Sequence, residues 1–213
     1  MAKNLVIIGA GGFGREMFAA AREAVGFGED FTVKGFLDGN PDALRGHAGY
    51  PEIIGTPETY GIEENDVFVT ALGNIAARRR CAAMIEGRGG RFVSVVHRSA
   101  SLGPNVTVGD GSFIAHNVVL TADVAVGRHS CVFQGTVIGH DASLADYTHV
   151  YSLVSIGGGV HVGEGVSVFP GARIVPRVAI GAGATVGIGS AVLRDVAPGT
   201  TVFGVPAARL KPF

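Results

Sequence analysis

Every sixth residue of this chain from Leu102 to Val192 is leucine, isoleucine or valine. The residue two places before each of them is alanine, valine, serine or threonine, so a second register repeats in step with the first. A period of six fits neither an amphipathic helix nor an isolated alternating strand. It predicts a solenoid of short parallel strands, in which each six-residue unit is one side of a coil and stacking buries a continuous aliphatic column.

Three sides per coil would give a repeat of eighteen residues, and small residues recur at that spacing. They are Gly109, Gly127, Gly163 and Gly181, with Ala145 at the remaining place. We expect them at tight corners between strands, where a Cβ atom would crowd a neighbour or where a positive φ is needed.

The first 95 residues lack the six-residue register and predict alternating strands and helices. Expected strands are 5–8, 32–37, 67–72 and 91–96; expected helices are 14–25 and 75–86; residues 40–57 are a stretch rich in proline and glycine. Such alternation indicates a small parallel α/β sheet. We therefore expect two domains, a Rossmann-like half domain over 1–95 and an all-β solenoid with a C-terminal tail over 96–213.

Composition narrows the class of function. Hydrophobic residues make up 47% of the chain and charged residues 16%, so a sizeable core is expected. A net charge of −1 without a basic run predicts neither nucleic acid nor an anionic membrane as a partner. The apolar run Leu5–Ile8 is too short for a signal peptide or a membrane span, which favours a cytoplasmic protein. The two cysteines, Cys81 and Cys131, suggest neither a disulfide nor a metal site.

A glycine-rich turn separates the first expected strand from the first expected helix. Residues 9–14 read GxGxxG, and Asp38 ends the second expected strand. Glycines let backbone N–H groups approach a phosphate, and the helix N-terminus favours an anion. Taken alone, the motif suggests a dinucleotide with Asp38 on a ribose hydroxyl, or else a tight turn without a ligand. Fewer than 100 residues make only one mononucleotide-binding half, which argues against NAD.

Several motifs in order along the chain resemble the NeuD/PglD family of hexapeptide-repeat sugar O- and N-acetyltransferases. They are GAGGFGRE (9–16 with its preceding strand), FLDGNP (36–41), ALGN (71–74) followed by Arg78–Arg80, VVHRSA (95–100), IGHD (138–141) and VFGVPAARL (202–210). The resemblance implies a left-handed parallel β-helix. The residues alone would have favoured a right-handed one, by the usual rule for parallel crossovers.

The resemblance places the catalytic base on His140, followed by Asp141. The residue types suit that role, because acyl transfer from a thioester needs a group that removes the acceptor's proton near neutral pH. An adjacent carboxylate can fix the tautomer and support the imidazolium. No GxSxG or Cys–His signature suggests a covalent nucleophile, so we expect direct transfer in a ternary complex.

Other acyl and cofactor contacts follow from the resemblance. It makes the Gly158 N–H a candidate donor to the thioester oxygen, as an oxyanion-binding group, with a plain corner glycine as the alternative. It also lets His149 approach the acyl carbonyl, with a structural or cofactor-packing role as the alternative. It also implies a slot for acetyl-CoA between subunits, lined by Pro170, Ala172, Gly187 and Gly189. Phosphates of the cofactor could meet Arg173, Arg177, Arg194 or Arg209, each equally plausible as a solvated surface charge.

The N-terminal domain is expected to bind the acceptor, a nucleotide sugar. The residues expected to contact it are Gly9, Gly11, Gly12, Phe13, Asp38, Gly73, Asn74 and Arg79. Many members of the family have histidine in place of Phe13 and an acidic residue in place of Gly39. These departures leave a different sugar, a different nucleotide or a non-nucleotide acceptor open.

Zinc is not expected. Ligands stacked on one face of the solenoid should be separated by multiples of eighteen, and no two histidines of the repeat region have such a spacing.

The sequence therefore predicts a homotrimeric, acetyl-CoA-dependent N-acetyltransferase acting on a nucleotide-linked amino sugar, of the 4-amino-6-deoxyhexose type, in bacterial glycan biosynthesis. Phe133, Tyr151 and Phe169, eighteen residues apart, predict an exposed apolar stripe that other subunits would cover. Sugar O-acetylation of the sialic-acid type is the alternative within the same enzyme class. A non-catalytic scaffold that binds a nucleotide sugar is the alternative from another class.

Overall fold

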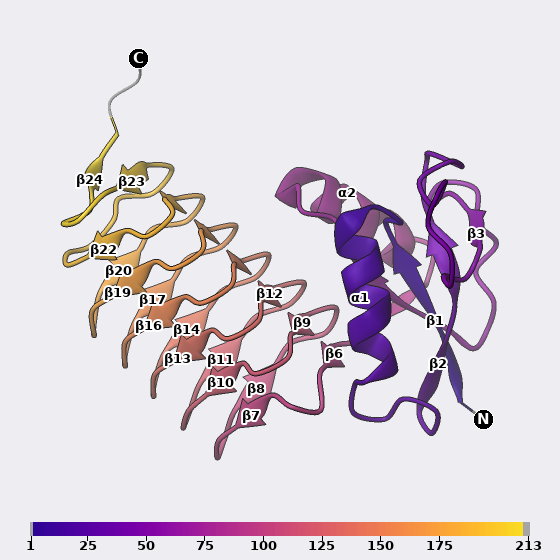
Figure 1. Cartoon of the computed structure of the whole chain (residues 1–213), viewed down its shortest axis with the longest axis horizontal. Coiled ribbons are helices and arrows are strands. Elements are labelled where there is room, and N and C mark those ends of the chain that lie inside the picture. The colour runs from indigo at the N-terminus through magenta and orange to yellow at the C-terminus, as the bar shows by residue number, and fades with distance from the viewer. Residues whose placement is uncertain (1, 211–213) are drawn as a thin grey trace. The chain divides into compact units, whose positions relative to one another are not determined.

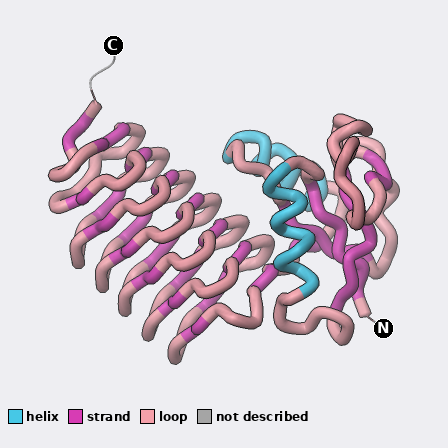
Figure 2. The backbone as a smooth tube through the Cα atoms, in the orientation of Figure 1, coloured by secondary structure: helices cyan, strands magenta, loops and turns pink. Residues whose placement is uncertain are grey.

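The computed structural model describes residues 2–210, which form two units with the division between Arg98 and Ser99. The first is an α/β unit with two helices around a sheet, and the second is a solenoid (Figures 1 and 2).

The α/β unit contains a five-stranded parallel sheet in the order β3-β2-β1-β4-β5. Its strands are β1 (Lys3–Ile8), β2 (Phe31–Leu37), β3 (Ile53–Gly55), β4 (Asp66–Thr70) and β5 (Arg91–Phe92). Helix α1 (Gly12–Arg22) connects β1 to β2, and α2 (Ile75–Glu86) connects β4 to β5. The continuous aliphatic run at the end of β1 is buried because strands flank it on both sides, as expected for the middle of a parallel sheet.

The expected elements of this unit agree with the structure in type, with differences at their ends. The helix expected over 75–86 is confirmed with the same bounds. Helix α1 begins two residues earlier than expected, directly after Gly11, and ends at Arg22 because Glu23 leaves the helical conformation. Strand β3 lies in the stretch rich in proline and glycine, where no strand was expected. The strand expected over 91–96 divides into β5 and a separate β6 (Val95–Val96).

Three faces of parallel two-residue strands form the solenoid, as the period predicted. The first face contains β7 (Ser101–Leu102), β10 (Val119–Leu120), β13 (Val137–Ile138), β16 (Ser155–Ile156), β19 (Arg173–Ile174) and β22 (Ala191–Val192). The second contains β8 (Thr107–Val108), β11 (Ala125–Val126), β14 (Ser143–Leu144), β17 (His161–Val162) and β20 (Ala179–Ile180). The third contains β9 (Phe113–Ile114), β12 (Cys131–Val132), β15 (His149–Val150), β18 (Ser167–Val168), β21 (Thr185–Val186), β23 (Thr201–Phe203) and the antiparallel β24 (Ala208–Arg209).

Each of these strands from β7 to β22 ends on one of the six-residue aliphatics, and the strands of successive coils pair eighteen residues apart. The aliphatic column is buried along most of its length, with Ile138, Val150 and Val168 wholly inaccessible. Leu102, on the first coil, is 40% exposed because no earlier coil covers it. The solenoid is a left-handed parallel β-helix, as the resemblance implied.

Three corners join the faces, and we name them by the turns that form them. The first corner, between the first and second faces, comprises turns 103–106, 121–124, 139–142, 157–160 and 175–178. The second comprises 109–112, 127–130, 145–148, 163–166 and 181–184, and the third 115–118, 133–136, 151–154, 169–172 and 187–190.

The recurring glycines at the second corner provide space rather than a positive φ. A Cβ atom at Gly127 would lie 2.7 Å from the carbonyl carbon of Ala145, and one at Gly163 would lie 2.6 Å from the backbone nitrogen of Ala182. The left-handed residues stand two places further along the same turns and include non-glycine residues such as His129, with φ 53°. Of the two reasons expected for these glycines, crowding is therefore the one that holds.

A buried acidic side chain fixes the start of β4 in the α/β unit. Asp66 accepts hydrogen bonds from the Tyr60 hydroxyl at 2.7 Å, the Glu63 N–H at 3.0 Å and Lys34 Nζ at 3.1 Å. Burial alone would raise the pKa of Asp66, but these donors outweigh it and hold the pKa below the ordinary value. The network therefore stabilises the unit only while Asp66 is charged.

Asp66→Asn should lower the free energy of unfolding at neutral pH by about 1–3 kcal/mol, because it removes the charge that these donors surround. A folded-state pKa below 3.8 means that the contribution of Asp66 is complete above that pH and is lost as the pH falls through the folded-state value. Urea unfolding followed from pH 7 to pH 2 should show the two proteins converging only below about pH 4. A difference that stays constant down to pH 2 would contradict this assignment.

Candidate active site

His140 and Asp141 form a hydrogen-bonded pair at the first corner. His140 Nδ1 lies 2.7 Å from Asp141 Oδ2, and the two side chains are 72% and 67% exposed. A proton on Nδ1 satisfies this bond and leaves the Nε2 lone pair free to accept another proton. Backbone bonds to the adjacent coils hold the turn, since the His140 carbonyl accepts from Gly159 N–H and Asp141 N–H donates to Ala122. The pair is therefore a rigid, solvent-accessible base.

Gly158 lies one coil further along, against the free side of the imidazole. A Cβ atom at position 158 would lie 2.7 Å from His140 Nε2 and 2.8 Å from Cε1, so only glycine leaves the ring in place. Within residues 2–210, the Gly158 N–H makes no hydrogen bond to the protein. A side chain at Gly139 would cover this nitrogen at 2.6 Å. Two glycines thus leave a basic nitrogen and a backbone donor open to the same ligand.

The structure places His149 away from this pair within one chain. His149 lies on β15 of the third face, is 2% exposed, and stacks against Phe133 at 4.9 Å between ring centroids. Its ring also lies 4.4 Å from that of Tyr151. Its approach to an acyl group stays a prediction, one that would require a second copy of the chain.

The four expected lining residues of the cofactor slot lie at the third corner, not at the corner of His140. Ala172 is fully buried, and its N–H and carbonyl both form hydrogen bonds within the solenoid. Gly187 is packed against Phe203, and Pro170 and Gly189 are more accessible. Their contact with a cofactor stays a prediction.

The aromatic stripe is only partly exposed. Phe133, Tyr151 and Phe169 stack with ring centroids 5.8 and 4.8 Å apart, which confirms their alignment. Phe133 is only 7% exposed, however, whereas Phe169 is 37% exposed. The expectation of a fully exposed stripe was wrong at Phe133, because the rings of Phe113 and His149 pack against it.

In the α/β unit, the glycine turn opens at the carboxyl ends of the central strands. Gly9 has a φ of 105° and lies so close to Ala71 that a Cβ atom would come within 2.8 Å of its carbonyl oxygen. Gly11 and Gly12 have open space around them, and the N-terminus of α1 has no side-chain cap. Phe13 follows in the first turn of the helix, half-buried. Free backbone donors at such an end suit an anion.

The order of the strands in the sheet also points to a ligand site at the glycine turn. The chain builds outward from β1 through β2 to β3 on one side, then returns to β4 and β5 on the other. In open parallel sheets, ligands bind where the order reverses, outside the carboxyl ends of the strands. That point lies between the turn after β1 and the turn 71–74 after β4.

The structure gives Asp38 a role that the motif did not show. Its Oδ2 accepts a hydrogen bond from Ala10 N–H at 2.7 Å, and its Oδ1 accepts one from Asn40 N–H at 2.8 Å. Asp38 therefore holds the glycine turn in shape, with lone pairs left for a ligand hydroxyl. Spacing alone could not reveal this bond, because it joins the ends of two different strands.

The turn after β4 carries the remaining expected contacts. Gly73 and Asn74 are exposed, and the Asn74 side chain caps α2 by accepting from Ala77 N–H at 2.9 Å. Arg79 is half-buried, whereas its neighbour Arg78 is fully buried. The sequence singled out the arginine run but did not distinguish these two positions.

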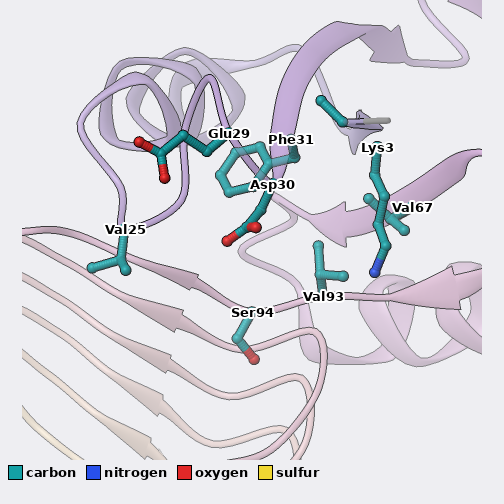
Figure 3. A pocket seen from close by; sticks show the side chains of 9 residues that line it. Lys3, Val25, Glu29, Asp30, Phe31, Val67, Val93 and Ser94 are labelled. Carbon is teal, nitrogen blue, oxygen red and sulfur yellow. The ribbon is translucent and has the colours of Figure 1, made fainter.

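A separate cavity of about 620 Å³ lies near the amino ends of the strands of this sheet, whereas the glycine turn lies at their carboxyl ends (Figure 3). Lys3, Asp30, Phe31 and Val67 are among its lining residues, all at or near the amino ends of their strands. Its position separates it from the glycine turn, so it is not the expected phosphate cradle.

Among residues 2–210, no cluster of three histidine, cysteine, aspartate or glutamate side chains could hold a metal ion. Neither helix in that range is long and apolar enough to cross a membrane.

Comparison with known proteins finds acetyltransferases among the proteins similar to this chain. Residues 4–85 match the PglD N-terminal domain family. The acetyltransferase domain of PglB from Neisseria gonorrhoeae is 26% identical, with 98% of this chain and 100% of that one aligned and a TM-score of 0.87. PerB from Caulobacter crescentus, solved with CoA and GDP-perosamine, is 30% identical over 98% of this chain and 97% of its own, with a TM-score of 0.86. A His-to-Asn mutant of perosamine N-acetyltransferase from the same organism, also with CoA and GDP-perosamine, is 29% identical over the same shares, with a TM-score of 0.88.

Proposed function

Because this chain belongs to the NeuD/PglD family of sugar acetyltransferases, we propose that it transfers the acetyl group of acetyl-CoA to the amine of a nucleotide-linked amino sugar. The observation that carries the proposal is the arrangement of His140, Asp141 and Gly158, which offers a base and an oxyanion donor at one place. The relatives solved with CoA and GDP-perosamine support both the donor and the class of acceptor.

The residues at the first corner suit direct transfer. His140 Nε2 removes a proton from the attacking amine as its nitrogen forms a bond to the acetyl carbonyl carbon. Asp141 stabilises the imidazolium that results. The Gly158 N–H donates to the carbonyl oxygen as negative charge develops on it. The C–S bond then breaks, and the imidazolium returns the proton to the sulfur of coenzyme A.

The α/β unit would hold the nucleotide of the acceptor. A diphosphate at the N-terminus of α1 would meet the N–H groups of Gly11 and Gly12, and Asp38 would accept from a sugar hydroxyl. We propose a sugar of the 4-amino-6-deoxyhexose type, in bacterial glycan biosynthesis. The complex of a relative with GDP-perosamine supports an amino sugar, whereas Phe13 and Gly39 distinguish this pocket from those of many members of the family.

The deciding experiment is an acetyl-transfer assay with a panel of acceptors. Nucleotide-linked 4-amino sugars, their hydroxyl counterparts and free amino sugars would each be incubated with acetyl-CoA, with thiol release and product mass as readouts. We expect thiol release and one added acetyl group with nucleotide-linked amino sugars. If only the hydroxyl counterparts are acetylated, the proposed N-acetyltransferase activity is wrong and the protein is a sugar O-acetyltransferase.

Asp38→Ala should raise the KM for the nucleotide sugar by about ten- to a hundred-fold, since it removes a hydrogen bond from a carboxylate to the ligand and loosens the turn. The KM for acetyl-CoA should stay the same, because the donor is proposed to bind the solenoid. Asp42→Ala is the matched control, because Asp42 is an exposed acid of the same unit and its side chain, within residues 2–210, pairs with Arg45 alone.

The competing dinucleotide interpretation of the turn is tested by calorimetry. Micromolar binding of NAD(H), together with no binding of any nucleotide or nucleotide sugar, would overturn the assignment of the α/β unit.

We further propose that the active assembly is a homotrimer. The exposed part of the aromatic stripe, from Tyr151 to Phe169, supports an interface on the solenoid. Light scattering should return a mass near three times the 21.8 kDa of one chain. A monomer at micromolar concentration would rule out both the trimer and a site shared between copies.

A further inference from the structure

The cavity at the amino ends of the strands in the α/β unit has the size of a ligand site. Its volume of about 620 Å³ lies within the range of about 300–1,000 Å³ that is typical of pockets for small molecules. Its lining residues, from Ala2 to Ser94, all belong to the α/β unit. No residue of the glycine turn or of the proposed reaction is among them, so acetyl transfer gives this cavity no role.

The register of the strands gives the cavity apolar walls. Strand β1 aligns Lys3 with Phe31 and, two residues further on, Leu5 with Val67. Because side chains alternate along a strand, those of Lys3, Phe31 and Val67 project from one face of the sheet. Phe31 and Val67 are buried, whereas Val25, in the segment after α1, is 67% exposed. A ligand in the cavity would therefore find apolar surface to cover.

The turn before β2 holds a carboxylate at the cavity. Asp30 N–H donates to the Gly26 carbonyl at 2.7 Å, and Gly28 N–H donates to the Phe31 carbonyl at 2.8 Å. Both glycines have a positive φ, 81° at Gly26 and 86° at Gly28. A Cβ atom at Gly26 would collide with Asp30 Oδ2, so the carboxylate lies over this glycine. Gly26 thus provides both the conformation of the turn and the space for the Asp30 side chain.

Opposite charges line the cavity without pairing. Figure 3 shows the Asp30 carboxylate and the Lys3 ammonium group on either side of Val93. Lys3, Asp30 and its neighbour Glu29 are exposed, and within residues 2–210 none of their charged groups forms a hydrogen bond or an ion pair. Each of these charges is therefore open to a ligand.

We propose that this cavity binds a small zwitterion of the size of a dipeptide, with its ammonium group at Asp30 and Glu29 and its carboxylate at Lys3. An ammonium group donates to carboxylates and a lysine donates to a carboxylate, so each end of the ligand meets a charged partner. In a single α-amino acid both charged groups share one carbon atom. A dipeptide is about 7 Å long when extended, which separates the charges, and an apolar side chain would pack on Phe31 and Val67.

The cavity is separate from the site proposed for the acceptor. The two lie at opposite ends of β1, whose six residues span about 20 Å. A dipeptide at the amino end and a nucleotide sugar at the carboxyl end can therefore be bound at the same time. Dipeptide binding does not depend on the acetyl-transfer reaction.

The test is calorimetric titration of the full chain with three probes. They are alanyl-phenylalanine, its N-acetyl form, which lacks the ammonium group, and its C-terminal amide, which lacks the carboxylate. Alanyl-phenylalanine should bind, and each of the other two probes should bind about tenfold more weakly, because a hydrogen bond between charged groups is lost. Absence of alanyl-phenylalanine binding at millimolar concentration would overturn the proposal.

Two variants assign each charge of the ligand to its partner. Asp30→Asn should weaken the binding of alanyl-phenylalanine and of its amide by about tenfold but leave the N-acetyl form unchanged, because that form has no ammonium group. Lys3→Gln should weaken the binding of alanyl-phenylalanine and of its N-acetyl form but leave the amide unchanged. An equal loss for all three probes in either variant would contradict the assignment.

Asp42→Asn is the matched control. Asp42 is an exposed acid of the same unit that lies after β2, at the carboxyl ends of the strands, and it does not line the cavity. Its loss should leave the affinity for every probe unchanged, whereas a loss equal to that in Asp30→Asn would show that binding follows the net charge and would overturn the proposal. Thermal melts that match that of the unaltered protein confirm that the variants are folded.

Binding is measured without acetyl-CoA or an acceptor, so this proposal and the proposed function fail separately. A protein that binds the dipeptide at Asp30 and Lys3 but acetylates no sugar would overturn the transfer reaction alone. A protein that acetylates a nucleotide sugar but does not bind the dipeptide would overturn the cavity assignment alone.

Discussion

Replacement of His140 by alanine should lower kcat by about 10²–10⁴-fold, the usual contribution of a general base. The variant keeps the carboxylate of Asp141 and the Gly158 N–H but has no group that takes the proton of the attacking amine. The melting temperature should hardly change, because the side chain is 72% exposed and packs on few neighbours. Steady-state thiol release and a thermal melt measure the two effects.

Asp141→Asn provides the graded control for this prediction. An amide keeps a hydrogen bond to Nδ1 but not the charge that stabilises the imidazolium, so the loss should be smaller than in His140→Ala. A near-normal kcat in His140→Ala would show that the acceptor loses its proton by another route.

Gly158→Ala should lower kcat by about a hundredfold, because the new methyl group takes the place of the imidazole edge. The methyl carbon would lie 2.7 Å from His140 Nε2, so the exposed ring must swing outward, and a displacement of about 1 Å can cost that much in rate. Alanine fits the backbone of this column, since Ala122 stands at the equivalent place two coils earlier. The melting temperature should therefore change little.

A double-mutant cycle separates this effect from a general disturbance of the corner. If Gly158 acts by leaving room for the ring, adding Gly158→Ala to His140→Ala should cost little more activity. Fully additive losses would show that the methyl group acts on something other than His140, such as the path of the donor.

The solenoid was predictable because its rule is local. Each aliphatic from Leu102 to Val192 marks the end of one strand, and no distant residue is needed to place it. The helix over 75–86 was likewise predictable, since the Asn74 cap lies next to it in sequence. Strand β3 was missed because its residues are unremarkable alone and gain their conformation by pairing with β2 at the edge of the sheet.

The sequence allowed the residues of the candidate site to be predicted, but not all of the hydrogen bonds and packing contacts between them. His140 and Asp141 are adjacent in sequence, so their hydrogen bond follows readily, and the eighteen-residue repeat brings Gly158 above them. The bond from Ala10 to Asp38 depends on how β1 and β2 align, and the burial of Phe133 depends on rings from neighbouring strands. Such contacts are set by packing between segments and leave no periodic signal.

The stacking of coils also affects how this protein can change. Each coil touches only its immediate neighbours, so stability is close to a sum of local terms and an altered coil disturbs little beyond the next one. Residues 175–192 lie two coils beyond the turn that carries His140. Exchanging them for the corresponding residues of another member should therefore leave His140 and Asp141 in place. The late coils and the corner of His140 can thus evolve separately on one molecule.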